Sequence, residues 1–314
     1  MSICTSDSFG REMCASLVLT SGSMVLYAFV LCVIVKNRRR GGESADIFRS
    51  SFFTLTLSIG AADFLEFFRA WLLNKLRYWG FFYEFYDSLE PAAAKLGATL
   101  SFQLSATQLF GLLLLAVNRF TAVFAPLRHA RVWKRAMPWA LALQWAVPLL
   151  FVPLVWRTRK LFYRLPNSSY VGALLPAGDV HRAIAYPIAL LILLVLCLST
   201  SGLYAAILFK MHKTLPTNKA KQAERQRGER KLVLSGLVNL VICCLLLLFV
   251  GISLLSRDAL RWRSLLAGTQ DLLTCNNPYT LLVCSSALRD RCRSRLCRRA
   301  PTKRAENTAQ PAAQ

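Results

Sequence analysis

Ionisable side chains inside long apolar stretches are the residues of this sequence best placed to do chemistry. Asp63, Glu66 and Arg69 follow one another at intervals of three residues, so a helix presents all three on one face. An ionised side chain at the centre of a bilayer costs roughly 2.5 to 3.5 kcal/mol on insertion scales. These residues are therefore expected to face other helices. There they form either a purely structural ion pair between Glu66 and Arg69 or part of a binding site.

A second polar group lies within the last apolar stretch. Asp271, Asn276 and Asn277 precede Pro278, which removes a backbone donor and bends a helix. Such a cluster beside a bend is either a moving part of the protein or an ordinary structural feature of a membrane helix.

The sequence contains no recognisable catalytic constellation. The three histidines, His129, His181 and His212, fall between the apolar stretches, so the embedded His and carboxylate clusters of metal hydrolases are missing. There is also no Gly-rich phosphate loop, no Gly-x-Ser-x-Gly motif and no paired-carboxylate signature. We therefore expect no enzyme, no cofactor and no metal ion.

Seven apolar stretches must position these residues. A helix of about 20 residues crosses the roughly 30 Å hydrocarbon core of a bilayer. Of the 314 residues, 55% are hydrophobic and 18% are charged, and no stretch alternates as a barrel strand does. The sequence therefore predicts an all-α membrane protein, a seven-transmembrane helix bundle. The predicted spans are residues 15–35, 50–73, 96–117, 137–156, 183–209, 232–255 and 264–287.

The distribution of basic residues predicts the orientation of the bundle. The formal net charge is +23, but the Lys and Arg residues lie between apolar runs, which argues against a nucleic-acid partner. Most of them fall in the loops and tail that are internal when the N-terminus is outside. The loop between spans four and five is also basic, which either attracts anionic ligands or reflects ordinary solvation. The predicted divisions are an extracellular segment 1–14, the bundle 15–287 and a cytoplasmic segment 288–314.

Two features of the expected outer segments predict covalent modification. Asn167 begins the only Asn-x-Ser/Thr sequon of the chain and falls in the second outer loop, so we predict that it is glycosylated. Cys4 and Cys14 both lie in the extracellular segment, where an oxidising compartment permits a local disulfide. The six cysteines inside the spans are expected to act as small apolar packing residues.

The segment after the last span combines an apolar stripe with many arginines. Leu288, Cys292 and Leu296 recur at every fourth position, which predicts a short amphipathic helix on the inner leaflet, in contact with membrane lipids. Cys292 and Cys297 are juxtamembrane and are therefore candidate palmitoylation sites. The alternative is a disordered basic tail.

Three motifs together resemble those of one receptor family. They are Asn118-Arg119-Phe120 followed by Trp133, Asp63 in the second span, and Asn277-Pro278-Tyr279 between Asp271 and Arg289. With seven spans and short loops, this set resembles the nematode serpentine chemoreceptors, in particular the class gamma and class v group.

The resemblance implies a G-protein-coupled receptor of the plasma membrane, or of a sensory cilium, in chemosensory neurons. Such a receptor detects a small-molecule or pheromone-like cue and activates a heterotrimeric G protein. Arg119 at the inner end of span three would exchange an internal partner for a cytoplasmic one. The switch residues that the resemblance implies are Asn118, Arg119, Phe120, Asp63, Asn277, Pro278 and Tyr279.

The chain departs from rhodopsin-like receptors in three ways. Asn118 replaces an acidic residue and cannot form its salt bridge, and Tyr279 follows Pro278 directly instead of standing further along the helix. No cysteine lies near the start of span three or in the second outer loop, so the disulfide typical of those receptors cannot form.

A ligand site is expected in the outer half of the bundle. Small-molecule sites in helix bundles lie between helices and combine apolar walls with a few polar anchors. The candidate anchors are Glu66, Arg69, Gln103, Gln108, Gln270 and Asp271.

Two other membrane functions stay open on the sequence. A seven-span transporter needs polar broken helices at mid-depth and usually an internal repeat, and no repeat is evident. A channel subunit of the insect odorant-receptor type has its N-terminus inside, which the Lys and Arg distribution disfavours.

Overall fold

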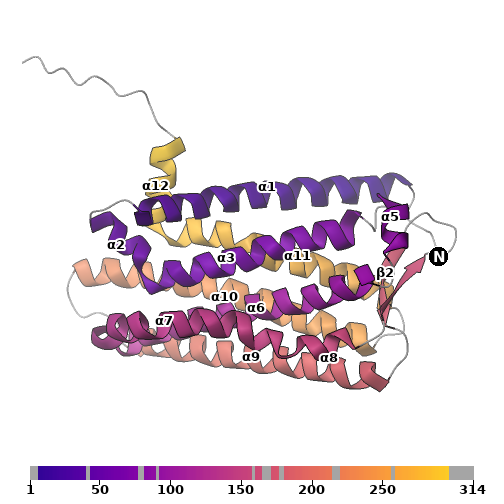
Figure 1. Ribbon diagram of the computed structural model, residues 1–314. Helices are drawn as coiled ribbons and strands as arrows, with labels where there is room; N and C mark the ends of the chain where they lie inside the picture. Colours follow the sequence, from indigo (N-terminus) through magenta and orange to yellow (C-terminus); the bar gives the residue numbers. More distant parts are fainter. Residues whose placement is uncertain are drawn as a thin grey trace, which may run out of the picture.

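The computed structural model describes residues 6–39, 43–76, 81–89, 92–157, 160–164, 171–176, 180–213, 220–255 and 259–296, and nearly all of these are helical. Seven long helical segments lie side by side along a common direction (Figure 1). This arrangement matches the bundle that the sequence predicts. The seven segments are α1 (Ser6–Arg39), α3 (Ser51–Arg69) with the π-helix η1 (Ala70–Lys75), α6 (Ala92–Phe124), α7 (Pro126–Leu149) with α8 (Val152–Trp156), α9 (Val180–Lys213), α10 (Ala220–Leu255) and α11 (Ala259–Cys284).

Four described helical segments are long and apolar enough to cross a membrane by themselves: Ser16–Arg39, Ser51–Lys75, Ala92–Phe124 and Leu190–Lys213. A shorter apolar run, Gly236–Ile252, lies within α10. The segments α7 and α11 are less apolar because α7 begins with basic residues and α11 carries the Asp and Asn residues that precede Pro278. Neighbouring helices must therefore supply hydrogen-bond partners for the polar groups that these two helices bury.

The helix that contains the fourth predicted span begins well before the apolar run. The helix α7 starts at Pro126 rather than at residue 137, with proline in its first turn, where the missing backbone donor costs nothing. The chain turns at residues 150 and 151 before α8 resumes with Pro153 in its first turn. The apolar run therefore predicted only the later, apolar part of this helix and not its basic first turns.

Short elements cover the two ends of the bundle. The helices α2 (Glu43–Arg49) and α12 (Ser286–Leu296) lie at one end, and α5 (Tyr83–Ser88) lies at the other (Figure 1). At the α5 end, β1 (Lys160–Arg164) and β2 (Val171–Pro176) form an antiparallel pair with a bulge between Phe162 and Tyr163. The sequence did not predict this pair.

The predicted helix after the last span is present, but its apolar stripe faces the protein. Leu288 and Cys292 are buried in the same cluster as Val30 and Ile34 of α1 and Phe48 of α2. The helix α12 therefore docks on the end of the bundle and turns away from the direction of α11 (Figure 1).

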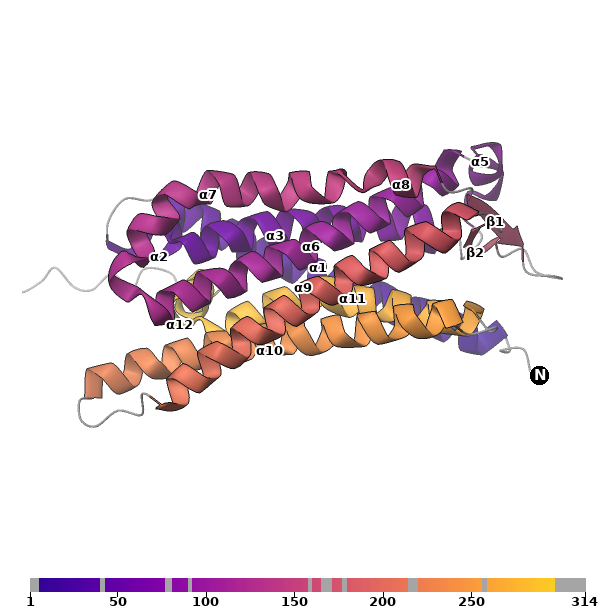
Figure 2. The same ribbon diagram turned by 90° about the horizontal axis from the view of Figure 1, so that it is seen from below.

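Basic residues gather at the α2 and α12 end of the bundle. In the view of Figure 2, α9 and α10 reach this end together, and α10 begins there. The last turns of α1 and α9 and the first turns of α7 belong to the same end. The described Lys and Arg residues there include Lys36, Arg38, Arg39, Arg49, Arg128, Arg131, Lys134, Arg135, Lys210, Lys213, Arg289, Arg291, Arg293 and Arg295.

A glycine allows α6 to approach α3 and α7 closely. A Cβ atom at Gly111 would lie 2.6 Å from Cγ1 of Ile59 and 2.7 Å from Nε2 of Gln144. At Gly202 of α9, by contrast, a Cβ atom would meet nothing within 4 Å.

We therefore expect Gly111→Ala to lower the melting temperature of the detergent-solubilised protein by several degrees, because overpacking a core costs about 1 to 3 kcal/mol. The control variant Gly202→Ala should leave it unchanged or raise it slightly, since alanine favours helix. Equal melting temperatures for the two variants would contradict this close packing.

Candidate functional site

Asp63 is the centre of the buried polar groups. Its side chain is almost fully enclosed, with 1% exposed, and its oxygens accept hydrogen bonds from three other helices. Oδ2 receives the Tyr27 hydroxyl of α1 at 2.8 Å and Nδ2 of Asn277 of α11 at 2.6 Å. Oδ1 receives Nε2 of Gln108 of α6 at 2.7 Å. These three donors are neutral groups, so the carboxylate is held without a cation at these contacts.

The small residue that precedes Asp63 on the same helix explains how α1 comes so close. A Cβ atom at Gly60 would lie 2.7 Å from Cδ1 of Leu31 and 3.2 Å from the Tyr27 hydroxyl oxygen. Small residues permit such approaches between membrane helices. The glycine thus places the Tyr27 hydroxyl within reach of Asp63.

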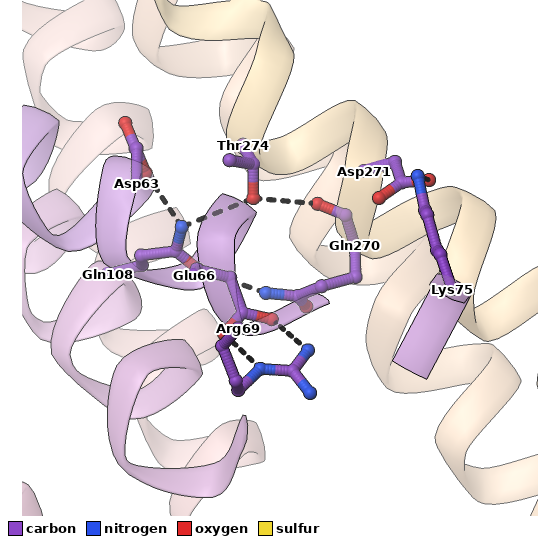
Figure 3. A network of polar contacts seen from close by, with 8 residues as sticks. All are labelled: Asp63, Glu66, Arg69, Lys75, Gln108, Gln270, Asp271 and Thr274. Atoms are coloured by element: carbon purple, nitrogen blue, oxygen red, sulfur yellow. Dashed lines mark hydrogen bonds and ion pairs between the residues drawn. The ribbon is translucent and has the colours of Figure 1, made fainter. Parts of the chain in front are cut away.

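Hydrogen bonds continue from Asp63 toward the outer half of the bundle. Gln108 accepts Nε2 of Gln270 at its Oε1, 3.0 Å away, and its own Nε2 also lies 3.3 Å from Oγ1 of Thr274 (Figure 3). The Thr274 hydroxyl donates in turn to the backbone carbonyl of Gln270 at 3.0 Å. One amide of α6 therefore links Asp63 of α3 to α11.

Two ion pairs lie beside this chain of hydrogen bonds. Arg69 binds both carboxylate oxygens of Glu66, from Nε at 2.7 Å and from Nη2 at 2.6 Å, and both side chains are buried. Lys75 binds Asp271 at 2.8 Å, and this pair is partly exposed. We call the eight residues drawn in Figure 3 the polar network: Asp63, Glu66, Arg69, Lys75, Gln108, Gln270, Asp271 and Thr274.

The π-helical turn η1 positions the second pair. It extends α3 over residues 70–75, and Nζ of Lys75 lies 3.1 Å from Oγ of Ser16 and 5.4 Å from the ring centre of Trp71. Turns of this kind are rare and occur frequently at functional sites. Here the turn carries a lysine to α1 and α11 together.

Asparagines extend the connections from Asp63 to α10. Nδ2 of Asn239 donates to Oδ1 of Asn277 at 3.1 Å, and Nδ2 of Asn276 donates to Oδ1 of Asn239 at 2.8 Å. Both partners precede Pro278 inside α11. The helix that carries the proline is therefore tied to α10 on one side and to Asp63 on the other.

A separate polar group closes the inner ends of α3, α6 and α7. Nδ2 of Asn118 donates to Oγ of Ser51 at 2.7 Å. Oγ1 of Thr121 donates to the carbonyl of Asn118 at 2.9 Å and accepts Nε1 of Trp133 at 2.7 Å. His129 lies between the two hydroxyls, 3.1 Å from Thr121 and 3.4 Å from Ser51.

Arg119 lies among these groups and is also buried. Its guanidinium carbon lies 3.8 Å from the ring centre of Phe52, an arrangement that stabilises a cation by the negative face of the ring. Phe120 stacks on Phe124 with ring centres 4.2 Å apart. The arginine is therefore held by an aromatic ring of α3, while its neighbour Asn118 connects α6 to Ser51 at the start of α3.

The structure brings together most of the predicted site residues but not all. Five of the six ligand candidates belong to the polar network, whereas Gln103 faces α7 and donates to the carbonyl of Trp145 at 3.2 Å. Tyr279 also lies apart from Asp63, with its hydroxyl 3.0 Å from Oγ of Ser23 on α1. Sequence reasoning missed Tyr27, Lys75, Thr274 and Asn239. Of these, Lys75 at the end of an apolar stretch was the one a charge pattern could have revealed.

Three of the predicted modification residues, Cys4, Asn167 and Cys297, lie outside the described residues, and so does the side chain of Cys14. Cys292 is described and is 5% exposed, and burial raises the pKa of its thiol. Acylation at Cys292 stays a prediction and requires α12 to leave α1.

The arrangement suits recognition and relay through hydrogen bonds. Among the described residues, no group of three or more His, Cys, Asp and Glu side chains could hold a metal ion. The polar network offers charged groups near the outer end and amides that can exchange hydrogen-bond partners deeper in the bundle.

Comparison with known proteins agrees with this architecture. The family model described as serpentine type 7TM GPCR chemoreceptor Srv matches residues 16–297. The Caenorhabditis elegans protein serpentine receptor class gamma-31 is 24% identical over 188 residues, which make up 57% of this chain and 57% of that relative. The aligned region thus spans little more than half of the relative's length. The family match confirms the predicted seven-transmembrane helix bundle.

The buried pair Glu66–Arg69 provides a test of the polar network. We expect Arg69→Met to lower the melting temperature strongly, because leaving one member of a buried ion pair alone costs about 3 to 5 kcal/mol. The double variant Glu66→Gln/Arg69→Met should recover much of the loss.

The matched control is Arg49→Met, which removes one member of the exposed Arg49–Asp46 pair, 3.9 Å apart. It should change the melting temperature little, since exposed pairs contribute almost nothing. A similar loss in both single variants would show that Glu66 does not depend on Arg69.

Proposed function

Because the chain belongs to the Srv family of serpentine seven-transmembrane G-protein-coupled chemoreceptors, we propose that it detects a small-molecule or pheromone-like cue and activates a heterotrimeric G protein. It is a multi-pass membrane protein, and we place it in the plasma membrane of a sensory cell, including its cilium. The family match favours a receptor over the transporter and channel alternatives.

The orientation that this function needs is supported by the charges. Basic residues occupy the α2 and α12 end of the bundle, which the positive-inside rule assigns to the cytoplasm. The polar network then opens toward the outside through Lys75 and Asp271, and Arg119 lies near the cytoplasm.

The observation that carries the proposal is the unbroken series of hydrogen bonds from the outer half of the bundle to α10. It runs through Gln270, Gln108, Asp63, Asn277 and Asn239, with donor–acceptor distances between 2.6 and 3.1 Å. A ligand that changes one partner at the outer end changes the hydrogen bonds available to the next. Two alternative arrangements of such amides would couple an outer ligand to the position of α10.

The ligand is proposed to engage the Lys75–Asp271 pair first. These side chains are 14% and 26% exposed, whereas Glu66 and Arg69 are enclosed, so only the former pair is open to an entering molecule. A cue with a polar or charged group can replace one member of the pair as partner of the other.

At the inner end, Arg119 is proposed to leave the ring of Phe52 and engage the G protein. Asn118 bonds Ser51 rather than forming a salt bridge with Arg119, and the contact with the ring of Phe52 helps to hold the guanidinium in its resting position. A guanidinium released from such a contact presents a planar set of donors to a partner.

We expect Lys75→Gln and Asp271→Asn each to weaken responses about tenfold, because each removes a charged contact with the ligand. The measurement is the concentration dependence of G-protein activation, in cells with a promiscuous G protein, for cues found by screening the unmodified receptor. Arg49→Gln, in an exposed pair far from the polar network, is the control. An unchanged response in both variants would place the ligand elsewhere.

We expect Arg119→Ala to abolish G-protein activation while surface expression is kept, because the coupling group is lost. Ligand-evoked nucleotide exchange and surface labelling are measured together. Lys134→Ala, an exposed basic residue of α7, is the control and should signal normally. Normal exchange by a surface-expressed Arg119→Ala protein would refute the proposed role.

A further inference from the structure

The inner part of α7 carries a basic surface hollow that the proposed relay does not use. The hollow measures about 430 Å³ and is lined by Arg131, Val132, Arg135, Ala136 and Trp139. All five residues belong to one helix, so the hollow is part of the outer surface of the bundle and not a gap between helices.

The helical spacing places the two arginines and the tryptophan in one row. Arg131, Arg135 and Trp139 follow one another at intervals of four residues, and Trp139 is 72% exposed. Trp133, Ala140 and Gln144 are buried on the opposite face, against α3 and α6. The row therefore points away from the bundle, toward the surrounding membrane.

The neighbouring side chains give the depth of this row. Beyond Trp139, the exposed residues of α7 are apolar and include Leu143 and Leu149, as expected for a face in contact with hydrocarbon. Tryptophan prefers the boundary between hydrocarbon and headgroups. At a rise of about 1.5 Å per residue, Arg135 lies roughly 6 Å and Arg131 roughly 12 Å from Trp139 along the helix. The headgroup layer occupies this range.

Neither arginine has an acidic partner on its own helix, because α7 contains no Asp or Glu. The ion pairs of the described residues also do not include Arg131 or Arg135. Two adjacent guanidinium groups at headgroup depth match a phosphate group, whose oxygens accept paired N–H donors.

We propose that this hollow binds the headgroup of an anionic phospholipid of the cytoplasmic leaflet. Arg131 and Arg135 contact its phosphate oxygens, the indole of Trp139 lies at the glycerol level, and the acyl chains follow the exposed leucines of α7. The anionic lipids of the cytoplasmic leaflet supply such headgroups.

The bound lipid stabilises the joint between α6 and α7. Trp133 lies between the two arginines in sequence but on the buried face of α7. There it donates to the hydroxyl of Thr121, which in turn donates to the carbonyl of Asn118. A lipid that binds the exposed face of this part of α7 also keeps its buried face against α6. The lipid thus acts on the same helix end as Arg119 without touching it.

The test uses the full-length protein in lipid nanodiscs of phosphatidylcholine, with or without a minor fraction of phosphatidylinositol phosphate. Lipids that stay bound after transfer to detergent are counted by native mass spectrometry. The unmodified protein should retain the anionic lipid, and Arg131→Gln/Arg135→Gln should weaken retention about tenfold. The control Lys134→Gln/Lys213→Gln removes the same charge from exposed positions of the same end and should retain the lipid.

Three results would overturn the proposal. One is equal loss of lipid in both double variants, which would indicate general attraction to a basic surface. Another is equal retention of phosphatidylcholine and the anionic lipid by the unmodified protein. The third is displacement of the lipid by an equimolar soluble inositol phosphate, which would make the site one for a free anion. Circular dichroism and melting temperature verify that each variant is folded.

Discussion

A carboxyl group enclosed in the middle of a membrane protein must find its hydrogen bonds within the protein, and Asp63 does so on three other helices. Its donors come from α1, α6 and α11, so the positions of these helices relative to α3 cannot change without changing the partners of Asp63. The apolar contacts of the bundle have no comparable directional requirement. This one group therefore fixes a relative arrangement that burial alone leaves adjustable.

Amides connect that fixed centre to parts of the molecule that can move. Gln108 and Gln270 join it to the outer half, and Asn277 and Asn239 join it to α10. An amide both donates and accepts, so it can exchange partners without leaving a charge unpaired. At the inner ends of α3, α6 and α7, hydroxyl, amide and indole groups connect the helices by hydrogen bonds, and the ring of Phe52 contacts Arg119.

The sequence predicted the shared face of Asp63, Glu66 and Arg69 because helical spacing alone decides it, and the structure confirms the buried pair. It could not predict that η1 carries Lys75 to Asp271, because a π-helical turn leaves no periodic signal. It could not predict that Gln103 faces α7, because polarity gives no direction around a helix that is buried on most faces. The docking of α12 depends on a surface of α1 that only the fold creates.

That docking makes two fates of Cys292 mutually exclusive. A thiol with 5% exposure cannot reach an acyl donor, and an acylated thiol cannot return to its buried place in the cluster between α12 and α1. If an acyltransferase modifies Cys292, it does so only in molecules whose last helix has come away from the bundle. The acyl chain would then keep the helix on the lipid, so that a brief local opening leads to a state that persists for as long as the thiol stays acylated.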